Sequence, residues 1–102
     1  MRNKILIVDD VEINRELLEE ILKDEYEILQ AENGKQALQV LEKFHDDIAV
    51  MLLDLIMPEM DGLTLLEEMN QKPWSNQIAV VIISSENTVQ TEARCFELGV
   101  SD

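Results

Sequence analysis

Three uninterrupted apolar runs divide the chain. They cover residues 5–8, 48–53 and 78–83, and each one ends directly at a polar residue. Strands that are buried on both faces of a parallel sheet have this continuous aliphatic character. A weaker apolar stretch at residues 26–31 stops before Glu32-Asn33-Gly34, which is typical of a turn. The pattern therefore predicts four strands.

Helical periodicity fills the segments that separate and follow these strands, because apolar residues recur there three or four positions apart. The helical patterns lie in residues 12–23, 37–44, 63–69 and 88–98. Lys72-Pro73 ends the third pattern, and Gly99 stands where a glycine commonly terminates a helix. Alternating helices and buried strands predict an α/β fold, with a parallel sheet covered by helices on both faces.

Composition limits the functions that such a fold could have. At 102 residues and 46% hydrophobic, the chain fits one domain over residues 1–102. The formal net charge of −14 argues against direct binding of nucleic acid or anionic membranes. Cys95 has no second cysteine to pair with, and the N-terminal apolar run is too short for a signal peptide or a membrane span. We therefore expect a cytoplasmic protein.

Polar residues with chemical potential cluster at the predicted strand ends. Asp9 and Asp10 follow the first strand, Asp54 follows the third, and Ser84 follows the fourth. Ligands of open α/β sheets bind at the carboxyl ends of the strands. Three neighbouring carboxylates would repel one another unless a cation such as Mg²⁺ neutralised them. One of them could then act as a nucleophile that forms an aspartyl-phosphate, with Ser84 as a hydrogen-bond donor.

Each of these residues also has a simpler interpretation. Asp9-Asp10 or Asp54 could cap the helix that follows, and Ser84 could be a hydroxyl with ordinary hydrogen bonds. The shared position at strand ends favours a common site over these separate explanations.

The motifs around these residues resemble the receiver domains of two-component response regulators. The most specific is Asp-x-x-Met-Pro-x-x-Asp-Gly, which runs from Asp54 through Met57-Pro58 to Asp61-Gly62. The matching segments extend from one end of the chain to the other and comprise residues 5–10, 51–62, 81–85 and 97–102. The resemblance implies a flavodoxin-like, doubly wound parallel sheet with strand order 2-1-3-4.

The resemblance also implies roles for the matching residues. Asp54 would accept a phosphoryl group from phosphohistidine on a histidine kinase or histidine phosphotransfer protein. Asp10, Asp54 and the backbone carbonyl of Ile56 would bind Mg²⁺, with Asp9 acting mainly through water. Ser84 would be the switch hydroxyl. The domain would be a switch and not an enzyme, beyond positioning the groups for its own phosphorylation.

Asn14-Arg15 resembles the same position in receivers that exchange phosphate with histidine phosphotransfer proteins. A solvent-facing polar pair is an equally open interpretation of these two residues.

The sequence departs from the family pattern after Asp102, because the usual fifth strand with its lysine and the fifth helix are missing. This predicts a C-terminally truncated receiver domain whose fourth strand is an apolar edge. Such an edge favours a homodimer, through edge pairing or exchange of elements, or else low stability.

Two other functions compete with the phosphorylation switch. A truncated receiver that cannot be phosphorylated could serve as an interaction or dimerisation module. A metal-dependent hydrolase is disfavoured, because no second acid follows Asp54 at two residues and no general base is evident.

Overall fold

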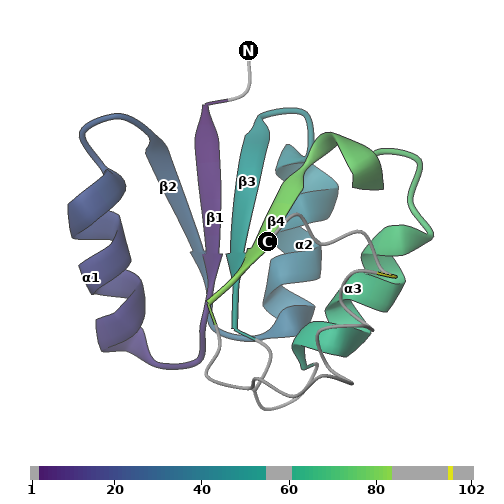
Figure 1. Cartoon of the computed structure of the whole chain (residues 1–102), viewed down its shortest axis with the longest axis horizontal. Helices are drawn as coiled ribbons and strands as arrows, with labels where there is room; N and C mark the ends of the chain where they lie inside the picture. The colour runs from purple at the N-terminus through teal and green to yellow at the C-terminus, as the bar shows by residue number, and fades with distance from the viewer. Residues whose placement is uncertain (1–2, 55–60, 84–96, 98–102) are drawn as a thin grey trace.

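Four parallel strands form a single sheet in the computed structural model, which describes residues 3–54, 61–83 and 97 (Figure 1). The sheet order is β2-β1-β3-β4, as predicted. The strands are β1 (Lys4–Val8), β2 (Glu27–Ala31), β3 (Ile48–Leu53) and β4 (Ala79–Ile82). Each agrees with a predicted strand to within a residue or two.

The helices described follow the predicted periodicity. They are α1 (Glu12–Leu22), α2 (Gly34–Phe44) and α3 (Gly62–Asn70), with a short 3₁₀ helix η1 (Ser75–Gln77) before β4. The periodicity did not predict η1, which is only three residues long. The predicted helix over residues 88–98, Cys95 and Gly99 lie outside the described residues, apart from Glu97.

Side-chain caps fix where two of the helices begin. Asn33 Oδ1 accepts the backbone N–H of Gln36 at 2.8 Å at the start of α2. Asp61 Oδ1 accepts the backbone N–H of Thr64 at 2.9 Å at the start of α3. Both bonds satisfy N–H groups that have no partner within the helix. By contrast, α1 begins after Val11, which makes no capping side-chain bond.

The two faces of the sheet are covered unequally. Side chains of α2 and α3, among them Leu41, Leu65 and Met69, pack with alternate residues of the strands into one hydrophobic core. We call this the closed face. On the other side, α1 buries none of its residues.

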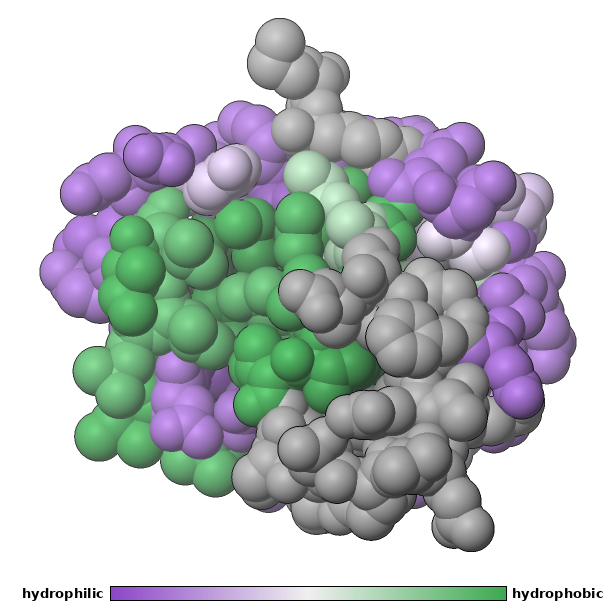
Figure 2. Space-filling model, viewed as in Figure 1, coloured by the Kyte–Doolittle hydropathy of each residue, from purple (hydrophilic) through white to green (hydrophobic). Residues whose placement is uncertain are grey.

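We call the α1 side of the sheet the open face. Its exposed apolar side chains form the apolar surface seen in Figure 2, and they are Val11, Ile13, Leu17, Ile21 and Ile83. Side chains of a strand alternate between the two faces of a sheet, so Ile5 and Ile7 of β1 point to the open face. Both are buried beneath this surface. None of the described helices combines the length and apolarity that a membrane span requires.

Candidate functional site

The backbone hydrogen bonds of the sheet continue one residue past the strand ends. The N–H of Asp9 donates to the carbonyl of Ala31 at 3.1 Å, and the N–H of Asp54 donates to the carbonyl of Val8 at 2.9 Å. Because the parallel strands are in register at Val8 and Leu53, Asp9 and Asp54 start side by side at the same edge. The sheet itself thus positions two of the predicted acids.

Asp9, Asp10 and Asp54 form a cluster of carboxylates at this edge. Each offers an oxygen that lies within 4.8 Å of the others. Asp9 is buried, Asp54 is partly exposed and Asp10 is exposed. The cluster therefore has one anchored member and two that a ligand or a partner can reach.

The anchored member, Asp9, is held by α1 and the turn before it. Its Oδ1 accepts the backbone N–H of Val11 at 2.9 Å, and its Oδ2 accepts Nδ2 of Asn14 at 3.3 Å. A buried carboxylate needs such donors to offset the loss of water. Asp9 does not cap α1. A capping side chain accepts an N–H from the first turn of the helix, whereas Asp9 accepts the N–H of Val11, the residue at the cap position itself.

Arg15 and Gln30 form a further layer behind Asp9, which the sequence did not lead us to expect as a unit. Arg15 Nη1 donates to the backbone carbonyl of Asp9 at 2.7 Å, and its Nε donates to Gln30 Oε1 at 3.0 Å. Gln30 Nε2 in turn donates to Glu19 Oε1 at 3.0 Å. The available signal was a glutamine inside the otherwise apolar end of β2. Both side chains of Asn14-Arg15 bond Asp9, although Asn14 is exposed and Arg15 partly exposed, so the pair faces solvent and contacts the site as well.

Comparison with known proteins identifies the family. A family model for the response regulator receiver domain matches residues 5–102. The chain belongs to the response regulator receiver family. Members of this family typically act as switches, and the phosphoacceptor role is typical of them.

A relative of this receiver domain is the response regulator RR06 of Streptococcus pneumoniae. It is 38% identical over 100 residues, which cover 96% of this chain and 43% of that protein. The receiver domain spans less than half the length of several curated relatives, 47% in one and 22% in another.

Solved structures confirm the fold of the receiver domain. A response regulator receiver protein from Pseudomonas putida has a TM-score of 0.88 at 26% identity, covering all of this chain and 84% of that one. A CheX-CheY-BeF₃-Mg²⁺ complex from Borrelia burgdorferi has a TM-score of 0.85 at 26% identity, covering 97% and 74%. The predicted flavodoxin-like sheet with order 2-1-3-4 is confirmed.

The acids of this receiver domain fit a hard divalent cation. Carboxylate oxygens are the ligands that Mg²⁺ prefers, and Mg²⁺ is usually held by one or two carboxylates while it keeps several waters. Asp10 and Asp54 are accessible enough to offer oxygens to such an ion, and Asp9 is oriented beside them. Ile56 and Ser84, the remaining predicted site residues, lie outside the described residues.

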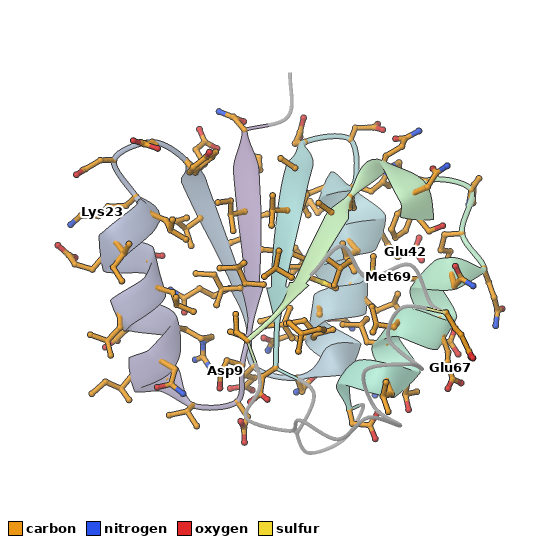
Figure 3. The ribbon with its side chains drawn as sticks, viewed as in Figure 1. Asp9, Lys23, Glu42, Glu67 and Met69 are labelled. Carbon is orange, nitrogen blue, oxygen red and sulfur yellow. The ribbon has the colours of Figure 1, made fainter. Side chains whose placement is uncertain are left out.

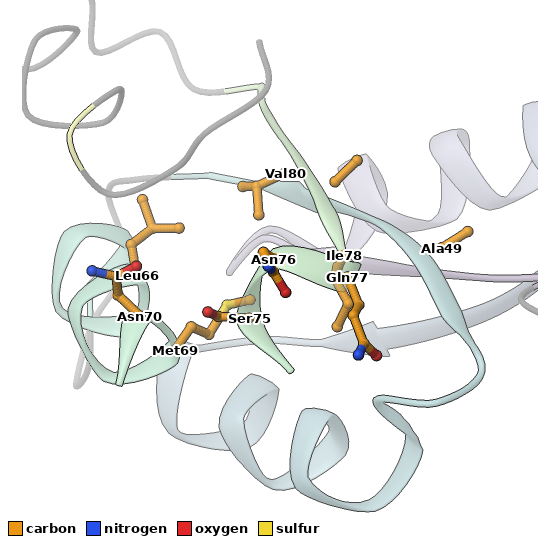
Figure 4. A pocket seen from close by; sticks show the side chains of 10 residues that line it. Ala49, Leu66, Met69, Asn70, Ser75, Asn76, Gln77, Ile78 and Val80 are labelled. Atoms are coloured by element: carbon orange, nitrogen blue, oxygen red, sulfur yellow. The ribbon is translucent and has the colours of Figure 1, made fainter. Parts of the chain in front are cut away.

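Two hollows on the surface differ in their relation to the acids. A shallow one beside the cluster is lined by Asp9, Asn14, Leu17, Leu18 and Ile83. Another lies between α3, η1 and the start of β4, near Met69 and Ile78, and none of the three acids lines it (Figure 4).

His45, the histidine of this chain, lies away from the acids. It follows α2 at the opposite end of the sheet and stacks on Trp74, with 4.9 Å between the ring centroids. The acid cluster is therefore the candidate site.

Proposed function

We propose that this receiver domain is a phosphorylation-operated switch in which Asp54 accepts a phosphoryl group from a histidine kinase or a histidine phosphotransfer protein. The observation that carries the proposal is the meeting of Asp54 with Asp9 and Asp10 at the carboxyl edge of the sheet. Family membership supports it, because the phosphoacceptor role is typical of receiver domains.

The proposed reaction is a transfer between two side chains. An oxygen of Asp54 attacks the phosphorus of phosphohistidine, the phosphorus–nitrogen bond breaks as the new oxygen–phosphorus bond forms, and the imidazole leaves. Mg²⁺, when bound, neutralises charge on the transferred group. Asp10 and Asp54 would bind the ion directly with the carbonyl of Ile56, and Asp9 would act mainly through water. Ser84 would then donate a hydrogen bond to the phosphoryl group as the switch hydroxyl.

The burial of the acids supports direct Mg²⁺ contacts from Asp10 and Asp54 and a water-mediated role for Asp9. Asp9 already uses both carboxylate oxygens in bonds to the protein, whereas Asp10 is exposed. A carboxylate with free access to solvent can exchange water for a metal ion at lower cost than one that must first give up internal bonds. Asp54, partly exposed beside them, remains within reach of an incoming phosphohistidine.

The proposal also covers the extent of the domain, its location in the cell, its partners and its oligomeric state. We infer one receiver domain over residues 1–102 in the cytoplasm, with no direct partner among nucleic acids or membranes, in line with the net charge of −14. Among the strands described, β4 is at an edge of the sheet. An apolar edge of this kind favours a homodimer, through edge pairing or exchange of elements, or else low stability. Light scattering from a well-behaved monomer with a cooperative melt would contradict it.

Acetyl phosphate with Mg²⁺, followed by intact-mass measurement, tests phosphoacceptance. The native chain should gain one phosphoryl group, and Asp54→Asn should gain none. Asp24→Asn is a matched control, because it removes an exposed carboxylate from the turn between α1 and β2. An unchanged mass for the native chain would contradict the phosphorylation switch. An equal gain in mass in Asp54→Asn would show that Asp54 is not the acceptor.

A further inference from the structure

Asp9 stands out as the buried charged residue of the part of the chain that the structure describes. Only 4% of it is exposed, and no other polar or charged residue in residues 3–54, 61–83 and 97 is buried. Ionised carboxylates remain buried only where hydrogen bonds compensate for the lost water. The donors around Asp9 therefore decide where its carboxylate lies.

One donor is the backbone N–H of Val11 just before α1, and the others come from the first turn of α1. Asn14 donates to the carboxylate of Asp9, while Arg15 donates to its backbone carbonyl. Arg15 also reaches Gln30 on β2, so its planar guanidinium joins the ends of two neighbouring strands. An arginine fork holds two acceptors in fixed geometry, which a lysine cannot do.

The same network attaches α1 to the sheet. This helix has no capping side chain and no buried residue, so apolar packing holds it less firmly than α2 and α3. The chain of bonds from Asp9 through Arg15 and Gln30 to Glu19 links β1, β2 and two turns of α1. Polar contacts therefore set the position of α1 beside the acids.

We propose that Arg15 and Asn14 are positioning residues which hold Asp9 in place and thereby set the affinity of the acid cluster for Mg²⁺. Gln30 supports them by holding the guanidinium of Arg15. This inference rests on the proposed function, because it assumes that the cluster binds the ion.

Charge and position make opposite predictions for Arg15. The guanidinium is a cation close to a cation site, so its removal should tighten Mg²⁺ binding if only charge matters. If Arg15 positions Asp9, its removal should weaken binding. Because Asp9 would act mainly through water, losing the residue that holds it should cost about 10-fold in affinity, the lower end of what partners of direct ligands contribute. The sign of the change therefore separates the two roles.

Lys23 provides a control for charge alone. It follows α1 at the end away from Asp9, as Figure 3 shows, and pairs with Glu20 at 3.0 Å. Lys23 is eight positions after Arg15, a rise of about 12 Å along the helix axis. Salt screens exposed charges beyond about 8 Å at physiological ionic strength, so Lys23→Gln should leave the Mg²⁺ affinity within about 2-fold of native.

Calorimetric titration of Mg²⁺ into the full chain tests the proposal. Arg15→Gln should weaken binding about 10-fold, and Arg15→Lys should also weaken it although the charge is kept. Gln30→Met changes no charge and leaves Asp9 untouched, and it should weaken binding measurably but by less than Arg15→Gln. Because this third variant is mild, it keeps the test valid even if Arg15→Gln does not fold.

The outcomes separate this inference from the proposed function. A native chain that binds no Mg²⁺ overturns the metal part of the proposed function and the inference with it. Native binding with tighter or unchanged affinity in Arg15→Gln and Gln30→Met overturns the positioning role alone. Native affinity in Arg15→Lys would show that a single donor at this position suffices, and would overturn the role given to the guanidinium fork and to Gln30.

Discussion

The closed and open faces of this sheet share the same strands but are stabilised in different ways. On the closed face, α2 and α3 are capped by Asn33 and Asp61 and bury aliphatic side chains against the strands. On the open face, α1 has no cap and leaves its apolar stripe exposed, with Ile21 73% accessible. The closed face therefore gives stability, while the open face holds α1 through hydrogen bonds beside the acids.

The largest expected effect is a cavity in the closed face. Leu41 is fully buried, so Leu41→Ala should lower the free energy of unfolding by about 2–5 kcal/mol. Leu17→Ala makes the same change on the open face, where Leu17 is 58% exposed, and should cost well under about 1 kcal/mol. Urea denaturation followed by circular dichroism measures both.

Leu41→Ala could prevent folding, since the free energy of unfolding of a whole domain is only about 5–15 kcal/mol. A pair of smaller substitutions therefore tests the same difference between the faces. Ile48→Val on the closed face should cost about 0.5–1.5 kcal/mol, and Ile21→Val on the open face should cost almost nothing. Equal losses in the two variants would mean that the two faces are packed alike in solution.

A smaller effect is expected from the helix caps. Asn33→Ala removes the side chain that accepts the N–H of Gln36 and should lower the free energy of unfolding by about 1 kcal/mol. Val11→Ala at the same position of α1 removes no capping bond and should change stability by only a few tenths of that amount. If the two variants shift the urea midpoint equally, capping does not distinguish the helices of the two faces.

The sequence predicted the closed face more completely than the open one. Continuous apolar runs such as Ile48–Leu53 leave little choice but a buried strand. The periodicity that begins at residue 37 predicted α2, although Asn33, expected in a turn, proved to be its cap. The periodicity of α1 was equally regular, yet periodicity reports which residues share a helix face and not whether another element covers them.

The acids of the site were also accessible to sequence reasoning, but their supporting bonds were not. Asp9, Asp10 and Asp54 follow strand ends, and parallel strands bring such ends together. The bond from Arg15 to Gln30 joins residues 15 positions apart on a helix and a strand. Its existence depends on how α1 is rotated against β2, which only the folded chain fixes.

The smallest expected effect is a pH-dependent ion pair on the closed side. Lys72, after α3, lies with its Nζ 2.8 Å from Glu42 Oε1 on α2, and the hydrogen bond and charge of Glu42 raise the pKa of Lys72 above its usual 10.5. The folded state thus favours protonated Lys72. This contribution to stability is fully present below the pKa of the unfolded chain and disappears as pH rises through the higher folded value.

Thermal melts of the native chain and Lys72→Met from pH 7 to 12 measure this contribution. The native chain should melt slightly higher at pH 7, because an exposed pair adds little, and the difference should vanish above the folded pKa of Lys72. Lys23→Met controls for the loss of a surface lysine from the pair on α1. A difference that grows with pH would contradict the raised pKa, and a loss as large as that of Leu41→Ala would mean that an ion pair, and not apolar packing, joins α2 to α3.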